Sequence, residues 1–91
     1  MTPTPQDRIR GHLEDARIAV LAELDTIPDP VTRQAAARDV LETLLPALSA
    51  DVKALRGRAV TELRQGRTLA QVGELLGGLS VGRVDQILKG R

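Results

Sequence analysis

Residues 68–89 read TLAQVGELLGGLSVGRVDQILK, and this stretch decides the fold of the C-terminal part of the chain. Thr68 followed three positions later by Gln71 has the form of a capping box, so a helix is expected to begin directly after Thr68. The double glycine that follows ends this helix, because glycine adopts the positive φ that a tight turn requires. Ser80 then caps a second helix. The stretch therefore predicts a helix-turn-helix.

Apolar residues in this stretch recur at helical spacing and predict how the two helices pack. Ala70 and Gly73 are small enough for the second helix to cross the first at that point. The side chains expected to face inward are Leu69, Val72, Leu75, Leu76, Val84, Ile87 and Leu88. The side chains expected to face outward on the second helix are Gly82, Arg83, Asp85, Gln86, Lys89 and Arg91.

The same residues carry a family resemblance. The run from Arg67 to Gly77, with Ser80 and the run from Arg83 to Gly90, resembles the region 4 helix-turn-helix of sigma-70-type factors. It is still more similar to small helix-turn-helix proteins common in actinobacteria and their phages. Leu55-Arg56, Ala59-Val60 and Glu62-Leu63 match the upstream part of that pattern. The resemblance covers residues 54–90, and the preceding half matches only in helical character.

The resemblance implies a sequence-specific double-stranded DNA-binding protein that reads the major groove with residues 80–89. Such a protein is either a transcriptional regulator or a small architectural DNA-binding protein. Arg83 and Gln86 would face the base edges, since Gln pairs with adenine and Arg with guanine or phosphate. Lys89 and Arg91 would add attraction that is independent of sequence. Thr68, Gln71 and Ser80 would contact phosphates.

Two departures from the family pattern concern the turn and the start of the second helix. The turn before Ser80 is one residue longer than usual, or the first helix extends to Gly78. Val81 and Gly82 stand where polar or basic residues are usual, although Val81 can contact a thymine methyl group. Asp85 would repel phosphate unless it accepts a hydrogen bond from cytosine or pairs with Arg83.

Charge divides the chain into two halves. Residues 1–51 hold five basic and nine acidic side chains, a net of −4, and residues 52–91 hold eight and three, a net of +5. This asymmetry indicates that the C-terminal half meets a polyanion. Residues 50–91 are expected to form the DNA-binding part, and residues 1–49 a helical dimerisation part.

Composition excludes several classes of protein. The chain has no cysteine and no aromatic residue, which excludes disulfides, thiolate metal sites and a stacking platform for single strands. The single His12 makes no metal site alone. No nucleophile–base pair or phosphate loop can be assembled, so neither an enzyme nor a cofactor is expected. Without a membrane-spanning run or a signal pattern, the cytoplasm is the expected compartment.

The N-terminal half predicts an antiparallel pair of helices, giving an all-α fold of four or five helices. Thr4-Pro5 begins a helix of about 20 residues, and Asp29-Pro30 begins the next. Pro46 is expected to kink or break that second helix into residues 30–45 and 46–65. An apolar stripe from Ile9 to Ile27 is either core or partner surface. We expect residues 5–48 to form a homodimer with two recognition helices one DNA turn apart.

Two alternatives stay open for the helix-turn-helix itself. Capped helices joined by a glycine turn also occur in helical domains that never touch DNA. The other alternative is a protein-interaction module that binds RNA polymerase or a regulatory partner through the same helices. In that case we expect substitution of Val81, rather than of Arg83 or Gln86, to weaken binding.

Overall fold

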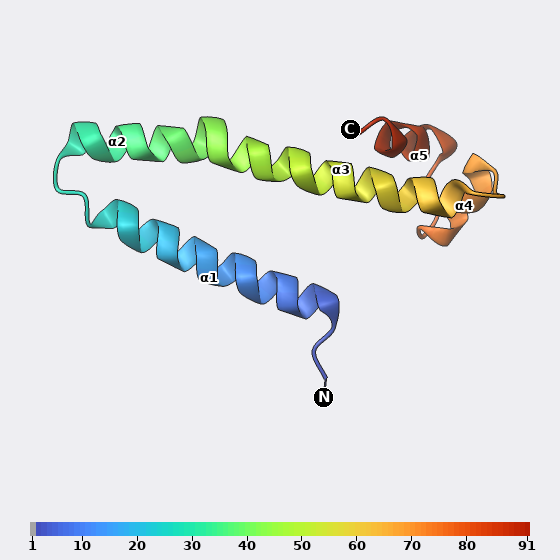
Figure 1. Ribbon diagram of the computed structural model, residues 1–91, viewed down its shortest axis with the longest axis horizontal. Helices are drawn as coiled ribbons and strands as arrows, with labels where there is room; N and C mark the ends of the chain where they lie inside the picture. The colour runs from blue at the N-terminus through green and yellow to red at the C-terminus, as the bar shows by residue number, and fades with distance from the viewer. Residues whose placement is uncertain (1) are drawn as a thin grey trace. The chain divides into compact units, whose positions relative to one another are not determined.

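The computed structural model describes residues 2–91, which contain helices and no strand, so the predicted all-α fold is confirmed. The elements in chain order are α1 (Pro5–Asp25), α2 (Pro30–Asp39), the π-helical turn η1 (Val40–Leu44), α3 (Leu45–Arg64), α4 (Leu69–Leu75) and α5 (Val81–Leu88) (Figure 1). The chain divides into two compact units, one ending at Glu42 and the other beginning at Thr43. The division falls within η1, ahead of the boundary predicted at residues 49 and 50.

The first unit holds two capped helices. Thr4 and Asp7 form a reciprocal capping box at the start of α1, with the Thr4 amide donating to Asp7 Oδ2 at 3.1 Å. Asp29 caps α2 by accepting from the Thr32 hydroxyl at 2.7 Å and the Thr32 amide at 3.0 Å. These hydrogen bonds stabilise both carboxylates and hold the pKa of Asp7 and of Asp29 below the ordinary value of 3.8.

Packing within the first unit is limited to the region of the turn. Helices α1 and α2 contact each other, but neither contains a buried residue. The half-buried residues of this unit are Leu24, Ile27, Ala36, Ala37 and Val40. The stripe that begins at Ile9 is open to solvent: Ile9 is 60% exposed and Leu13 54%. Within the first unit, the interpretation of this stripe as core holds only near the turn, at Leu24 and Ile27.

Pro46 does not break the helix. The backbone stays helical from Pro30 to Arg64, and Pro46 lies in the first turn of α3, directly after η1. Proline lacks the N–H that an α-helical ladder needs, so the ladder is interrupted here. The interruption takes the form of a π-helical turn. The second predicted piece, residues 46–65, is found as Leu45–Arg64, whereas the first α-helical piece ends at Asp39 rather than at residue 45. Of the two alternatives left open at Pro46, a separation of the pieces does not occur.

The second unit has a small aliphatic core. Helix α3 contacts α4 and α5, and α4 contacts α5. The core residues are Val60, Val72, Val84 and Ile87, and the half-buried residues packed on them are Leu63, Leu69, Leu76, Leu79 and Leu88. The predicted inward face is confirmed except at Leu75, which is 58% exposed. Leu75 lies about 60° around the helix from Val72, on the side away from Leu76, and this side faces water.

Glycines shape the turn and the crossing of α4 and α5. The amides of Gly78 and Leu79 both donate to the Gly73 carbonyl oxygen, at 3.0 and 2.9 Å. Gly77 and Gly78 each have a φ of +91°, and α4 ends at Leu75, so the turn is longer rather than the helix. Gly73 is buried at the crossing as predicted. Ala70 is exposed, so its predicted packing role is wrong.

Candidate nucleic-acid interface

Helix α5 has one buried side and one open side. Ser80 begins the helix, its Oγ accepting from the Arg83 amide at 3.1 Å. Val84 is fully buried and Ile87 is 4% exposed, which anchors the helix on α3 and α4. Because the apolar residues recur on one side, the intervening polar residues face away from the core. The predicted inward side of this helix is therefore confirmed, whereas Arg83 and Asp85, which were predicted to face outward, are half-buried.

Arg83 and Gln86 come together on the open side. The Arg83 Nη1 atom donates to Gln86 Oε1 at 3.3 Å, with Arg83 half-buried and Gln86 exposed. One guanidinium has five N–H donors, so this hydrogen bond leaves most of them for another acceptor. The Gln86 amide also keeps its own two N–H donors. The pair therefore offers several donors from one turn of helix.

Asp85 and Lys89 form an ion pair across one turn of α5. The Lys89 Nζ atom lies 2.8 Å from Asp85 Oδ2, and both side chains are partly exposed. Asp85 pairs with Lys89 rather than with Arg83, which corrects one of the predicted arrangements. The i,i+4 spacing from the acidic to the basic residue accounts for the choice. The pair reduces the repulsion that Asp85 would exert on a phosphate.

Thr68 and Gln71 stand at the start of α4, apart from the α5 residues. The Thr68 amide donates to Gln71 Oε1 at 2.8 Å, and the Gln71 amide donates to Thr68 Oγ1 at 3.2 Å. The capping box uses the two side-chain oxygens as acceptors. It leaves the Thr68 hydroxyl proton and the Gln71 side-chain NH₂ to donate elsewhere. Among residues 2–91, no hydrogen bond or ion pair joins this pair to the α5 residues.

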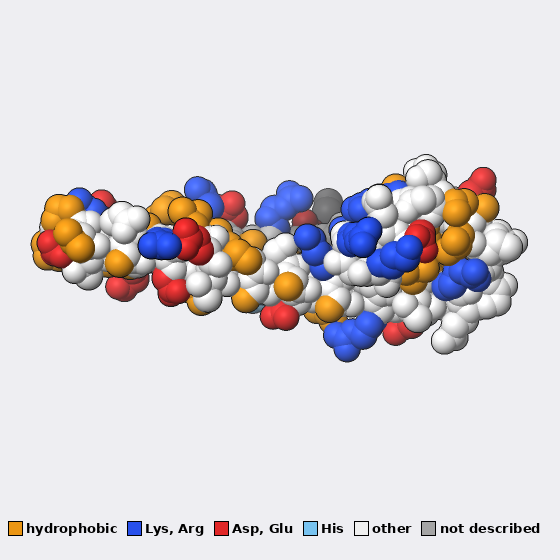
Figure 2. Space-filling model, turned by 90° about the horizontal axis from the view of Figure 1, so that it is seen from above, with side chains coloured by type: hydrophobic (Ala, Val, Ile, Leu, Met, Phe, Trp, Pro, Cys, Tyr) orange, Lys and Arg blue, Asp and Glu red, His pale blue; other side chains and the backbone are white. Residues whose placement is uncertain are grey.

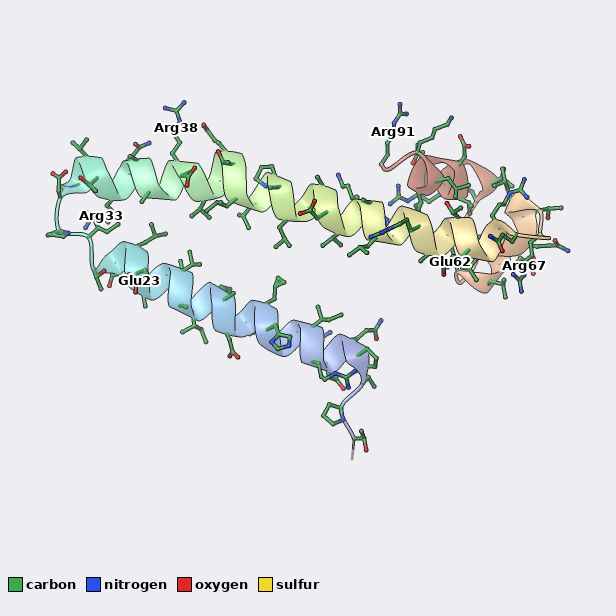
Figure 3. The ribbon with its side chains drawn as sticks, viewed as in Figure 1. Glu23, Arg33, Arg38, Glu62, Arg67 and Arg91 are labelled. Carbon is green, nitrogen blue, oxygen red and sulfur yellow. The ribbon has the colours of Figure 1, made fainter. Side chains whose placement is uncertain are left out.

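The remaining predicted residues are open to solvent, with the exception of Asp85. Ser80, Val81, Gly82, Lys89 and Arg91 are exposed, and Asp85 is half-buried. The second unit carries eight Lys and Arg against four Asp and Glu, a net of +4. Blue side chains gather where this unit lies in Figure 2. Arg67 lies beside the connection between α3 and α4, and Arg91 beside the end of α5 (Figure 3).

Two contacts of α3 were not predicted from the sequence. The Arg56 Nη2 atom donates to the Arg91 carbonyl oxygen at 2.6 Å, which links α3 to the segment after α5. A Cβ on Gly57 would lie 3.2 Å from the Ile87 carbonyl oxygen, so a small residue lets α5 approach α3 closely. The two pairs are 35 and 30 residues apart in sequence, and no local pattern links them.

The structure was also searched for a metal site and for a membrane-spanning helix, and the chain was compared with known proteins. Residues 2–91 contain no cluster of three or more His, Cys, Asp or Glu able to hold a metal ion. None of the described helices combines the length and the hydropathy needed to cross a bilayer. Comparison of the chain with protein-family models, curated proteins and solved structures found no match.

Proposed function

We propose that this protein binds double-stranded DNA and acts as a transcriptional regulator, with α5 in the major groove. The observation that carries the proposal is the orientation of α5. Its aliphatic side, Val84 and Ile87, is buried, whereas Gln86 and Lys89 on the other side are open to solvent. An α-helix fits the major groove, and amide and guanidinium donors are the groups that read base edges there.

Phosphate contacts would position the helix. Thr68, Gln71 and Ser80 are exposed polar side chains near the starts of α4 and α5, and such groups commonly donate to phosphate oxygens. The net charge of +4 on the second unit supplies attraction that does not depend on sequence. The resemblance to sigma-70 region 4 supports transcription as the process. The cytoplasm is the compartment that fits this role.

The test begins with selection of bound fragments from a random or genomic DNA pool. Enrichment of a short consensus, followed by fluorescence anisotropy on that site, is the expected result. Arg83→Ala and Gln86→Ala should each lower the affinity by about tenfold or more, since a good base contact contributes about 1–3 kcal/mol. The matched controls are Arg38→Ala and Gln34→Ala on α2, which should bind like the parent protein. No enrichment from either pool would contradict the proposal.

Exposed apolar side chains on the helix-turn-helix favour a second candidate, a protein-interaction module. Leu75 is 58% exposed and Val81 47%. A partner such as RNA polymerase would cover these side chains, as apolar contacts do at the centres of interfaces. Val81→Ser would then weaken partner binding while Gln86→Ala would not. DNA binding reverses this order of sensitivity.

A further inference from the structure

Apolar side chains cover more than one side of α1. Ile9 and Ile18 are each 60% exposed and stand nine positions apart. At 3.6 residues per turn this spacing is two and a half turns, so the two side chains project from opposite sides of the helix. Leu13 lies close to the side of Ile9, and Leu21 lies nearer that of Ile18. Both leucines are more than half exposed.

One chain cannot cover both sides of α1. The only other long helical run among residues 2–91 extends from Pro30 to Arg64, through α2, η1 and α3. A helix packed along α1 covers one side of it, because an interhelical contact uses a single stripe. The opposite side of α1 is then available to a helix from another molecule. This conclusion holds for any placement of α1.

Helix α3 carries a second uncovered stripe. Leu48, Val52 and Leu55 recur at helical spacing and are 47%, 55% and 57% exposed. Gly57, which approaches the Ile87 carbonyl oxygen, lies two positions after Leu55 and so about 200° around the helix. The stripe therefore faces away from α5. A partner can occupy it without touching the proposed DNA-binding side of α5.

We propose that a second copy of this chain covers both surfaces, forming a homodimer of packed helices. The two surfaces are complementary in charge: α1 has a net charge of −2 and α3 a net charge of +2. Both also carry aliphatic stripes at helical spacing. Two copies therefore provide for each other the partner that each surface lacks. Closed two-fold pairing is the commonest form of such self-association.

The exposed apolar area of the two surfaces is close to that of a standard interface. The large apolar side chains concerned on α1 and α3 are Ile9, Leu13, Ile18, Val20, Leu21, Leu45, Leu48, Val52 and Leu55, each 40–60% exposed. At about 1.45 Å² of surface per dalton of exposed chain, their exposed fractions amount to roughly 750 Å² per chain. A standard protein–protein interface buries about 800 Å² per partner. Homodimer interfaces are also richer in apolar area than other interfaces.

The experiment is sedimentation equilibrium of the full chain without DNA, at tens of micromolar. We expect twice the mass of one chain. Ile18→Lys should raise the dissociation constant of the dimer by about tenfold or more, as should Leu48→Lys. Ala19→Lys is the matched control, because exposed Ala19 lies on the remaining, polar side of α1. The control should leave the dissociation constant unchanged.

A second measurement uses the parent chain alone, so that the test does not depend on whether the variants fold. The thermal midpoint of the parent chain should rise with protein concentration, as mass action requires of a dimer. A monomer at tens of micromolar, or a midpoint independent of concentration, overturns the proposal. A dimer that is indifferent to Ile18→Lys and to Leu48→Lys overturns the assigned surface. Because no DNA is present, these outcomes are separate from the success or failure of the proposed DNA binding.

Discussion

A Cβ atom on Gly73 would lie 2.2 Å from the carbonyl oxygen of Leu79, far inside van der Waals contact. The backbone of the turn thus occupies the space that a side chain would need. Gly73→Ala should lower the free energy of unfolding by about 1–3 kcal/mol, because the crossing of α4 and α5 must open. Urea denaturation followed by circular dichroism measures the change.

The control for this prediction is Gly82→Ala in the same motif. Gly82 is helical, and a Cβ there meets nothing closer than Ser80 Oγ at 4.0 Å. Alanine should raise the free energy of unfolding by about 0.5–1 kcal/mol through helix propensity. Equal effects of the two substitutions would show that the close approach to Leu79 has no energetic consequence.

Removing the charge of Asp85 should strengthen DNA binding. Asp85→Asn releases Lys89 from its ion pair and removes an anion from the proposed interface. The affinity at low salt should rise by roughly threefold to tenfold. The slope of the logarithm of the binding constant against the logarithm of the salt concentration should steepen by about one. Anisotropy titrations at several salt concentrations measure both. Glu42→Gln, which frees Arg38 from a similar i,i+4 pair on the first unit, should change neither.

Ser80 allows stability and binding to be separated. Ser80→Ala removes the N-cap of α5 and should lower the free energy of unfolding by about 1 kcal/mol. Ser80→Asp keeps a capping oxygen, so stability should return to near the parent value. Its negative charge would nevertheless face the DNA and weaken binding. Denaturation and anisotropy on the same samples test the two effects, and undiminished DNA binding by Ser80→Asp would place the phosphate elsewhere.

The cap of α2 predicts an acid dependence of helicity. The Thr32 hydroxyl and amide hold the pKa of Asp29 below its ordinary value. A carboxylate whose pKa is lowered by folding stabilises the folded state above the unfolded pKa. This stabilisation is lost as the pH falls through the lower, folded pKa. Helix content measured by circular dichroism should therefore decline in acid. Asp29→Asn should show a smaller decline, because asparagine caps without titrating.

Local chemistry explains what the sequence could predict. The capping box of Thr68 and Gln71 and the aliphatic side of α5 depend only on neighbours within a few positions. The crossing at Gly73 follows from the same local pattern. The prediction that Leu75 faces inward was wrong. Leu75 stands at the edge of the apolar stripe of α4, where burial depends on the position of α3. The sequence predicted an interruption of the helix near Pro46 but did not specify its form. In the structure this interruption is the π-helical turn η1.

Long-range relationships could not be predicted from the sequence. The hydrogen bond from Arg56 to the Arg91 carbonyl joins residues 35 positions apart. Exposure of Ile9 and Ile18 depends on which molecules surround α1, and a periodic pattern does not identify its neighbour. The roles of Arg83 and Gln86 stay predictions, because a free outward side is a requirement for reading DNA and not a demonstration of it.

The core of the second unit draws its four buried apolar side chains from three helices. Val60 comes from α3, Val72 from α4, and Val84 and Ile87 from α5. Each helix thus loses buried neighbours when another detaches, and the three should melt in one transition. Amide hydrogens throughout α4 and α5 should then exchange through the same global opening. A peptide that lacks α3 would keep only α4 to orient α5 and would lose the core contact of Val60, however well it retained the motif's residues.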